Sequence, residues 1–400
     1  MIAHKNSLKL ISVGAILLTF FSVLTTYAAP KKIAVKSVSV FAEVPGAEAV
    51  IVTESNIITV ANTYGQSADI EVRALDFSGV QVWSKTIDSG QDEVATVFTS
   101  DAKGSIWLAG NSASAMAIDT QTSVSVDLNP DGVNIENPMP LRPDLNNLTL
   151  WQVSANGEII LATSELQSVP VLVEAISVSS SGASILITRD SKQLIIPVVA
   201  NKFGKAFTIG TTKTQLTAVV RAKSGTTYAF GSSTETLSGK KLMGIQDGIL
   251  LKFSKIGKLN KVVRSSAAKS RREWQSATSS LFLAGSIKTG SSVQSTLTKF
   301  TKKFAPRWTT RITSSGRTLV VSGANGSVYA ILEAKSLVDG IRGWKPVKGQ
   351  SLIVQFDSKG KTMNAYTSPE LGVVMAAGFS DSAGLFILTE DERIWKINES

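Results

Sequence analysis

The sequence predicts an all-β fold, a single β-propeller of about seven four-stranded blades. Short apolar, β-branched runs alternate with clusters of Gly, Ser, Asn, Asp and Lys, which is typical of strands joined by turns. No amphipathic helix follows the apolar N-terminal segment. Two strand phrases recur along the chain with a period of roughly 40–55 residues, the length of one propeller blade.

The first recurring phrase is a strand, a polar turn and a second strand. It reads "EVRALDFSGVQVWSKTI" at 71–87, "LLKFSKIGKLNKVV" at 250–263 and "LIVQFDSKGKTMNAY" at 352–366. Its turn positions are Gly79, Gly157, Gly204, Gly257, Ala305 and Gly360. The first gap is 78 residues, about twice 39, and a degenerate copy at 116–126 lies halfway along it. Each copy predicts two strands of one blade.

The second phrase is a buried strand that follows some 20 residues later. It appears as "SIWLAGNS" (105–112), "TYAFGSST" (227–234), "LFLAGSIK" (281–288), "SVYAILEA" (327–334) and "GLFILTED" (384–391). The small pairs Ala109-Gly110 and Ala284-Gly285 predict a position where strands crowd and larger side chains do not fit. The strand recurs because it fills the same layer in successive blades.

The two ends of the repeat region are incomplete and complementary. Residues 33–42 read as a lone strand, and "ERIWKI" (392–397) reads as half of a first phrase. Pairing the first strand with the last blade closes the ring and hides two sheet edges.

The stretch "DFSGVQVWSKTI…DEVATVF…DAKGSIWLAGNS" (76–112) resembles the repeat of secreted bacterial β-propellers of the seven-bladed and quinoprotein-like groups. The resemblance is clear in two or three blades, whereas the periodicity covers nearly all of the chain. It implies the fold. It implies quinone-cofactor chemistry only weakly, because this fold recurs without the cofactor.

The N-terminal segment predicts export. Lys5 and Lys9 precede an apolar run from Leu10 to Leu24, and "TTYAAP" offers small residues for cleavage after Ala28. We expect a signal peptide at 1–28, with an uncleaved membrane-anchor helix as the alternative, and a propeller domain at 29–400. Either alternative places the propeller outside the cytoplasm, at the cell surface or secreted. Membrane contact is then expected only through an uncleaved N-terminal segment.

Two residue types are missing from the predicted mature chain. There is no Cys, and the single His is His4, inside the predicted signal. This excludes a Ser-His-Asp triad, a Cys nucleophile and His/Cys zinc or copper sites. Carboxylates, Lys, Tyr, Ser and Thr are left for chemistry.

The charge is divided between two sectors of the chain. Residues 31–170 hold 7 basic and 17 acidic residues, whereas 201–310 hold 20 basic and 3 acidic ones. The basic sector predicts a face for an anionic polymer of the cell envelope or for a protein partner, without a role for nucleic acid. Its candidate ligand-binding residues are Lys255, Lys258, Lys261, Arg264, Lys269, Arg271, Arg272, Trp274, Lys302, Lys303 and Arg307. The alternative is a solvated surface, with Trp274 and Trp308 in the core.

"DLNPDG" (127–132) is the one motif with metal-ligand spacing. Asp127, Asn129 and Asp131 alternate before Gly132, as in the first half of a Ca²⁺ loop. The twelfth position is Pro138, where an EF-hand needs Glu, so a plain hairpin turn is the alternative. No other cofactor is expected.

We therefore expect an exported propeller that acts as a binding or scaffolding module at the cell envelope. The sequence leaves catalysis open and favours a module without it. The alternative function is a His-free, carboxylate-dependent carbohydrate enzyme that works from the propeller channel.

Overall fold

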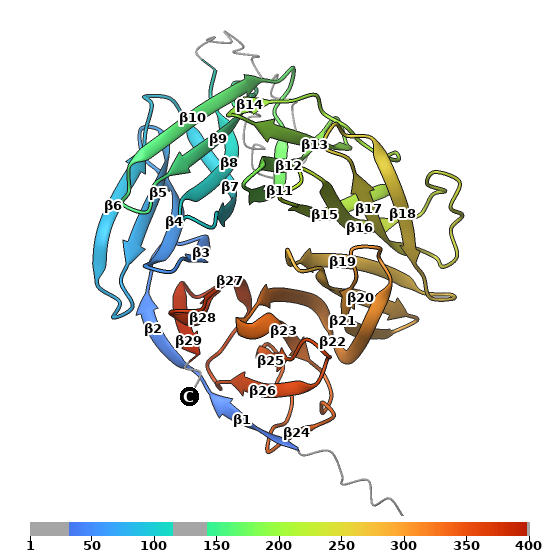
Figure 1. Cartoon of the computed structure of the whole chain (residues 1–400). Coiled ribbons are helices and arrows are strands. Elements are labelled where there is room, and N and C mark those ends of the chain that lie inside the picture. Colours follow the sequence, from blue (N-terminus) through green and yellow to red (C-terminus); the bar gives the residue numbers. More distant parts are fainter. Residues whose placement is uncertain (1–31, 115–141, 398–400) are drawn as a thin grey trace, which may run out of the picture.

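The computed structural model describes residues 32–114 and 142–397. Strands make up almost all of its regular structure, with one 3₁₀ turn at Ala324–Gly326. The strands form sheets arranged as a ring (Figure 1). The predicted signal or anchor helix and the predicted Ca²⁺ loop lie outside the described residues.

Five blades are separate four-stranded sheets, each antiparallel. The first is β3 (Ala49–Val52), β4 (Ile57–Tyr64), β5 (Ala68–Leu75) and β6 (Gln81–Ile87). The second is β7 (Glu93–Ser100), β8 (Ile106–Ser112), β9 (Asn147–Val153) and β10 (Ile159–Leu166). The third is β11 (Leu172–Ser179), β12 (Gly182–Arg189), β13 (Lys192–Val199) and β14 (Lys202–Phe203). The fourth is β15 (Thr214–Arg221), β16 (Thr227–Ser233), β17 (Asp247–Phe253) and β18 (Leu259–Ser265). The last is β27 (Val374–Ser380), β28 (Gly384–Thr389), β29 (Arg393–Ile397) and β2 (Ser39–Glu43).

The remaining sector of the ring is one nine-stranded sheet. Its order is β19 (Arg271–Ala277), β20 (Phe282–Thr289), β21 (Ser292–Phe300), β22 (Pro306–Ser322), β23 (Val328–Ala334), β25 (Leu352–Phe356), β26 (Thr362–Thr367), β1 (Ile33–Ser37) and β24 (Ile341–Arg342). The first half of β22 pairs with β21 and its second half with β23. The expectation of about seven separate blades is therefore corrected to five, because the continuous β22 fuses the rest of the ring into one sheet.

The innermost strands surround the axis of the ring. They contact one another in the order β3, β7, β11, β15, β19, β22, β27 and back to β3 (Figure 1). Asn62 of β4 illustrates how neighbouring sheets are joined: its side chain accepts from Ala95 N and donates to Ala95 O, both at 2.9 Å. Most hydrophobic clusters likewise join two neighbouring sheets, so much of the core lies between the blades.

The ring closes through its N-terminal strands. β2 pairs antiparallel with β29, and Phe41 packs edge-on against Phe386 at 5.0 Å between ring centres. β1 adds a parallel pairing with β26, with Val35 opposite Ala365. The predicted pairing with the last blade is confirmed for the second half of 33–42, which is β2, whereas the first half, β1, pairs with the nine-stranded sheet.

The small residues of the second phrase lie where neighbouring strands crowd. A β-bulge in β19 brings Glu273 O so close to Gly285 that a Cβ there would lie 2.0 Å from it. A Cβ at Gly110 would lie 1.9 Å from Val94 O, beside the bulge of β7. The expectation for the Ala-Gly pairs is confirmed.

The ring has two faces, which the strand connections define. We call "turn face" the face with the tight turns β5–β6, β9–β10, β17–β18, β21–β22 and β25–β26. The connections that enter each new innermost strand, such as 266–270, lie on the opposite face, because successive strands run antiparallel. Trp308 joins two neighbouring turns on the turn face, since its Nε1 donates to Ser358 O at 3.0 Å.

Candidate anion-binding face

Two neighbouring turns on the turn face, with the strands that leave them, bring together six of the ten predicted basic residues. Lys255 and Lys258 are exposed in the β17–β18 turn, and Lys302 and Lys303 are exposed in the β21–β22 turn. Lys261 Nζ donates to Lys303 O at 2.8 Å, so the two turns lie side by side. With Arg307, these residues form what we call the basic turn patch.

Local sequence holds these lysines outward. In the β17–β18 turn, Ser254 Oγ accepts from Lys258 N at 3.1 Å, and Gly257 supplies a φ of +79°. In the β21–β22 turn, Thr301 Oγ1 accepts from Ala305 N at 3.1 Å, and the buried ring of Phe304 anchors the loop. The polar turn residues thus fix the backbone and leave the lysine side chains in solvent.

The patch is extended by three further lysines, which were not among the residues predicted from the sequence. Lys223 is exposed in the β15–β16 connection, and Lys359 and Lys361 are exposed in the β25–β26 turn. Asp357 Oδ1 accepts from the backbone N of both, at 2.8 and 2.9 Å, and so shapes that turn without neutralising it by an ion pair. The signal was available, because "DSKGK" (357–361) occupies the same turn of the repeated phrase.

The patch carries positive charge without paired carboxylates. Across residues 32–114 and 142–397, the ion pairs involve arginines, and none involves a lysine. The pKa of Lys299, beside the patch, responds to its surroundings. Burial lowers the pKa of the Lys299 ammonium, and the charge of Arg307 lowers it further. A bound anion would relieve that repulsion.

The rest of the predicted cluster lies on the opposite face, which corrects the idea of one continuous site. β18 carries the chain from the β17–β18 turn to the other face, a rise of about 20 Å over its length. Lys269 and Arg271 follow there and are exposed. Residues adjacent in sequence therefore point to two separate surfaces.

Three predicted ligand-binding residues are buried by packing, Trp274 and Arg272 between blades and Arg264 within the fourth sheet. Trp274 is 0 % exposed, so it cannot stack on a surface ligand. The side chains of Arg264 and Asp247 are 6 % and 0 % exposed and form an ion pair at 3.1 Å. Arg272 is buried with its guanidinium 4.5 Å from the Trp274 ring centre, and burial, with the charge of Arg311, lowers its pKa to about 10. These roles correct the assignment of all three as ligand-binding residues.

Trp308 is half-buried and packs between two repeats of the nine-stranded sheet, as the alternative interpretation of a packed tryptophan expected. A Cβ at Gly360 would lie 2.7 Å from the Trp308 ring, so the ring packs directly on the glycine turn of the next repeat. Trp83 makes the same contact with Gly157.

The central channel holds a pocket of about 460 Å³ lined by the innermost strands. Its lining is mostly small and apolar, with the carboxylates Glu48 and Glu174. Glu48 accepts from Asn62 Nδ2 at 2.7 Å, and Glu174 accepts from Thr188 Oγ1 at 2.5 Å. They belong to sheets that are separated by the β7–β10 sheet.

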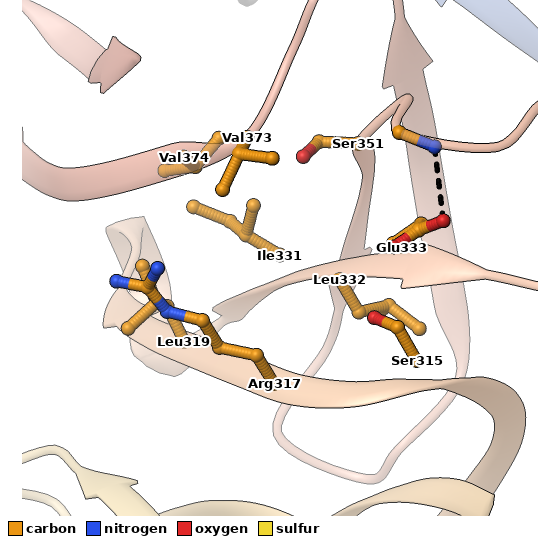
Figure 2. A pocket seen from close by; sticks show the side chains of 10 residues that line it. Ser315, Arg317, Leu319, Ile331, Leu332, Glu333, Ser351, Val373 and Val374 are labelled. Carbon is orange, nitrogen blue, oxygen red and sulfur yellow. Dashed lines mark hydrogen bonds between the residues drawn. The ribbon is translucent and has the colours of Figure 1, made fainter. Parts of the chain in front are cut away.

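A smaller pocket of about 50 Å³ lies between β22, β23 and β27. Figure 2 shows Arg317 and Glu333 at its rim, with Ile331, Val373 and Val374 around it. Glu333 Oε1 accepts from Gly349 N at 2.9 Å, the dashed contact in Figure 2. This volume holds one or two water molecules rather than a sugar.

Among the described residues, no helix has the length and hydropathy needed to span a bilayer.

No family model and no curated protein matches the chain. The chain is similar to a solved β-propeller domain of Cps50 (Swd1) from Myceliophteria thermophila, with 9 % identity, coverage of 89 % of this chain and 97 % of that one, and a TM-score of 0.51. It is also similar to a streptogramin B lyase (10 % identity, 90 % and 97 % covered, TM-score 0.47) and to virginiamycin B lyase from Staphylococcus aureus (8 %, 89 % and 97 %, TM-score 0.49). At these identities the likeness shows the fold alone, a β-propeller.

Proposed function

We propose that the protein is a binding module that holds an anionic polymer on its basic turn patch. The observation that carries the proposal is the gathering of exposed lysines from neighbouring turns, none of which forms an ion pair within the described chain. Such a surface binds polyanions by releasing their counterions, and the affinity falls as salt rises.

The opposite sector of the turn face supports this assignment. Its turns carry the acidic residues Asp76, Asp101 and Glu158. Repulsion from that side directs an approaching polyanion to the sector from β15 to β26. The ligand class follows from charge: an acidic polysaccharide or a phosphate-rich polymer. A role at the cell envelope depends on the N-terminal export signal and is part of the proposal.

A charge-reversal experiment tests the patch. The chain 29–400 is titrated with polyphosphate and with polygalacturonate from low to high salt, with neutral dextran as a blank. The test variant carries Lys255→Glu, Lys258→Glu, Lys302→Glu and Lys303→Glu. The matched control carries Lys240→Glu, Lys241→Glu, Lys269→Glu and Arg271→Glu, an equal charge change at exposed residues away from the turn face. We expect at least a tenfold loss of affinity in the first variant and a much smaller loss in the second.

Two results would overturn the proposal. One is the absence of binding to either polyanion at low salt. The other is an equal loss in both variants, which would show a response to net charge rather than to one face.

The second candidate function is carbohydrate cleavage in the central channel, favoured by Glu48 and Glu174 in its lining. Activity on acidic or neutral polysaccharides that Glu174→Gln abolishes, and that the four-lysine variant retains, would support the enzyme over the binding module.

A further inference from the structure

Three carboxylates from the first two sheets meet on the face opposite the turn face. Asp69 lies near the start of β5, Asp88 directly follows β6, and Glu93 is the first residue of β7. One oxygen from each lies within 4.8 Å of the others. Two oxygens that each lie about 2.4 Å from one Ca²⁺ ion are at most about 4.8 Å apart, and the three carboxylates meet this condition.

Glu93 is buried without a neutralising partner. It is 1 % exposed, and its Oε2 has no hydrogen-bond partner. The nearby Arg142 pairs with Asp92 and Asp144 instead, and no ion pair in the described chain reaches Asp69, Asp88 or Glu93. Burial raises the pKa of the Glu93 carboxyl, and the charges of Asp69 and Asp88 raise it further against the hydrogen bonds from Ser89. A bound cation would offset the repulsion among these three carboxylates.

The neighbouring polar groups hold the three side chains in position. Ser67 Oγ lies 3.0 and 3.2 Å from the two oxygens of Asp69, and Asp88 Oδ1 accepts from Gly90 N at 2.7 Å. Ser89 Oγ donates to Glu93 Oε1, which leaves Oε2 free. Each carboxylate therefore keeps lone pairs for a cation, and the exposed Asp88 leaves one side open to water ligands.

We propose that Asp69, Asp88 and Glu93 form a binding site for one hard divalent cation, Ca²⁺, which joins the first sheet to the second. An all-oxygen set of carboxylates and waters selects Ca²⁺ or Mg²⁺ over softer metals, and Ca²⁺ tolerates irregular geometry. The proposal uses other residues than the predicted Ca²⁺ loop at Asp127, Asn129 and Asp131. It does not depend on the polymer-binding proposal.

Calorimetric titration of the EDTA-treated protein with CaCl₂, and then with MgCl₂, tests the site. The variants are Glu93→Gln, which keeps the side-chain volume, and Asp88→Asn, which is exposed and leaves packing intact. The controls are Asp381→Asn, an exposed carboxylate of the β27–β28 connection, and Asp131→Asn in the predicted loop. We expect each test variant to remove one Ca²⁺ site or to weaken it at least tenfold, while both controls bind as the parent protein does.

Thermal unfolding with and without Ca²⁺ gives an independent measurement. The midpoint should rise with Ca²⁺ in the parent protein and in Asp381→Asn, and stay constant in Asp88→Asn. Absence of binding at millimolar Ca²⁺, or binding that survives Asp88→Asn and disappears in Asp131→Asn, would overturn the proposal. Asp88→Asn decides the question if Glu93→Gln does not fold.

Discussion

Single glycines set how closely the strands of a blade can approach. Gly285 and Gly110 occupy the same position of the second phrase, and each faces a carbonyl oxygen of the bulged innermost strand. Beside the bulge of β7, Asn62 of the preceding sheet holds Ala95 by two hydrogen bonds. Glycine is required at this position because the bulged innermost strand leaves no room for a side chain.

Gly285→Ala should therefore destabilise the fold by about 3 kcal/mol or more, because the Cβ meets backbone that cannot rotate away. Gly372→Ala is the matched control, since a Cβ there has nothing within 4 Å. Its unfolding free energy should change by less than about 0.5 kcal/mol. Urea denaturation of both variants measures the difference, and similar values for the two would contradict the crowding argument.

At the scale of elements, the repeat could be predicted from the sequence, whereas the two sites could not. The Gly turns and Ala-Gly strands predict hairpins because their spacing is local, and the ring closure followed from the two half-phrases. The basic cluster failed as one site because β18 carries Lys258 and Lys269 to different faces, which composition does not reveal. Asp69, Asp88 and Glu93 share no short motif, since only the pairing of β5 with β6 and the contacts between the first two sheets bring them together.

The hydrogen bond from Ala68 N to Asp92, which joins the first two sheets, predicts that the stability of the fold depends on pH. Arg142, before β9, bridges Asp92 and Asp144. The hydrogen bond from Ala68 N lowers the pKa of Asp92, with Arg142 adding to it, and Arg142 lowers the pKa of Asp144. The native state therefore binds these protons less tightly than the unfolded chain, whose Asp pKa is about 3.9. The resulting stabilisation is present above that pH and lost as the pH falls through the lower native values.

Arg142→Gln should reduce stability by at most about 1 kcal/mol at pH 6, because Arg142 is half-exposed. The gap to the parent protein should close toward pH 2. Thermal unfolding from pH 6 to pH 2 in EDTA measures it, and Arg342→Gln, exposed in β24, controls for the loss of one charge. A gap that stays constant down to pH 2 would rule out the bridge as its source.

At the scale of the whole molecule, the ring places opposite charges on opposite sides of one face. The acidic sector from β3 to β10 and the basic sector from β15 to β26 lie across the channel from each other (Figure 1). This arrangement gives the turn face a dipole that orients a charged partner before contact. This dipole requires the closed ring, because the ring keeps the two sectors on opposite sides of the channel. We therefore expect binding to depend on ring closure.

Closure rests on strands from the two ends of the chain. A chain that begins after Glu43 loses β2 and β1, which leaves β29 and β26 as open edges. Its unfolding midpoint should fall well below that of a chain that begins at Lys32 and keeps both strands. A synthetic peptide of residues 32–43, added in excess, should raise the midpoint again in a concentration-dependent way, because it binds the open edge of the native state. Phe41→Ala, which removes the contact with Phe386, should cost about 2 kcal/mol in the intact chain. An unchanged midpoint after removal of both strands would show that the contacts of β27 and β28 with β3 are enough to hold the ring closed.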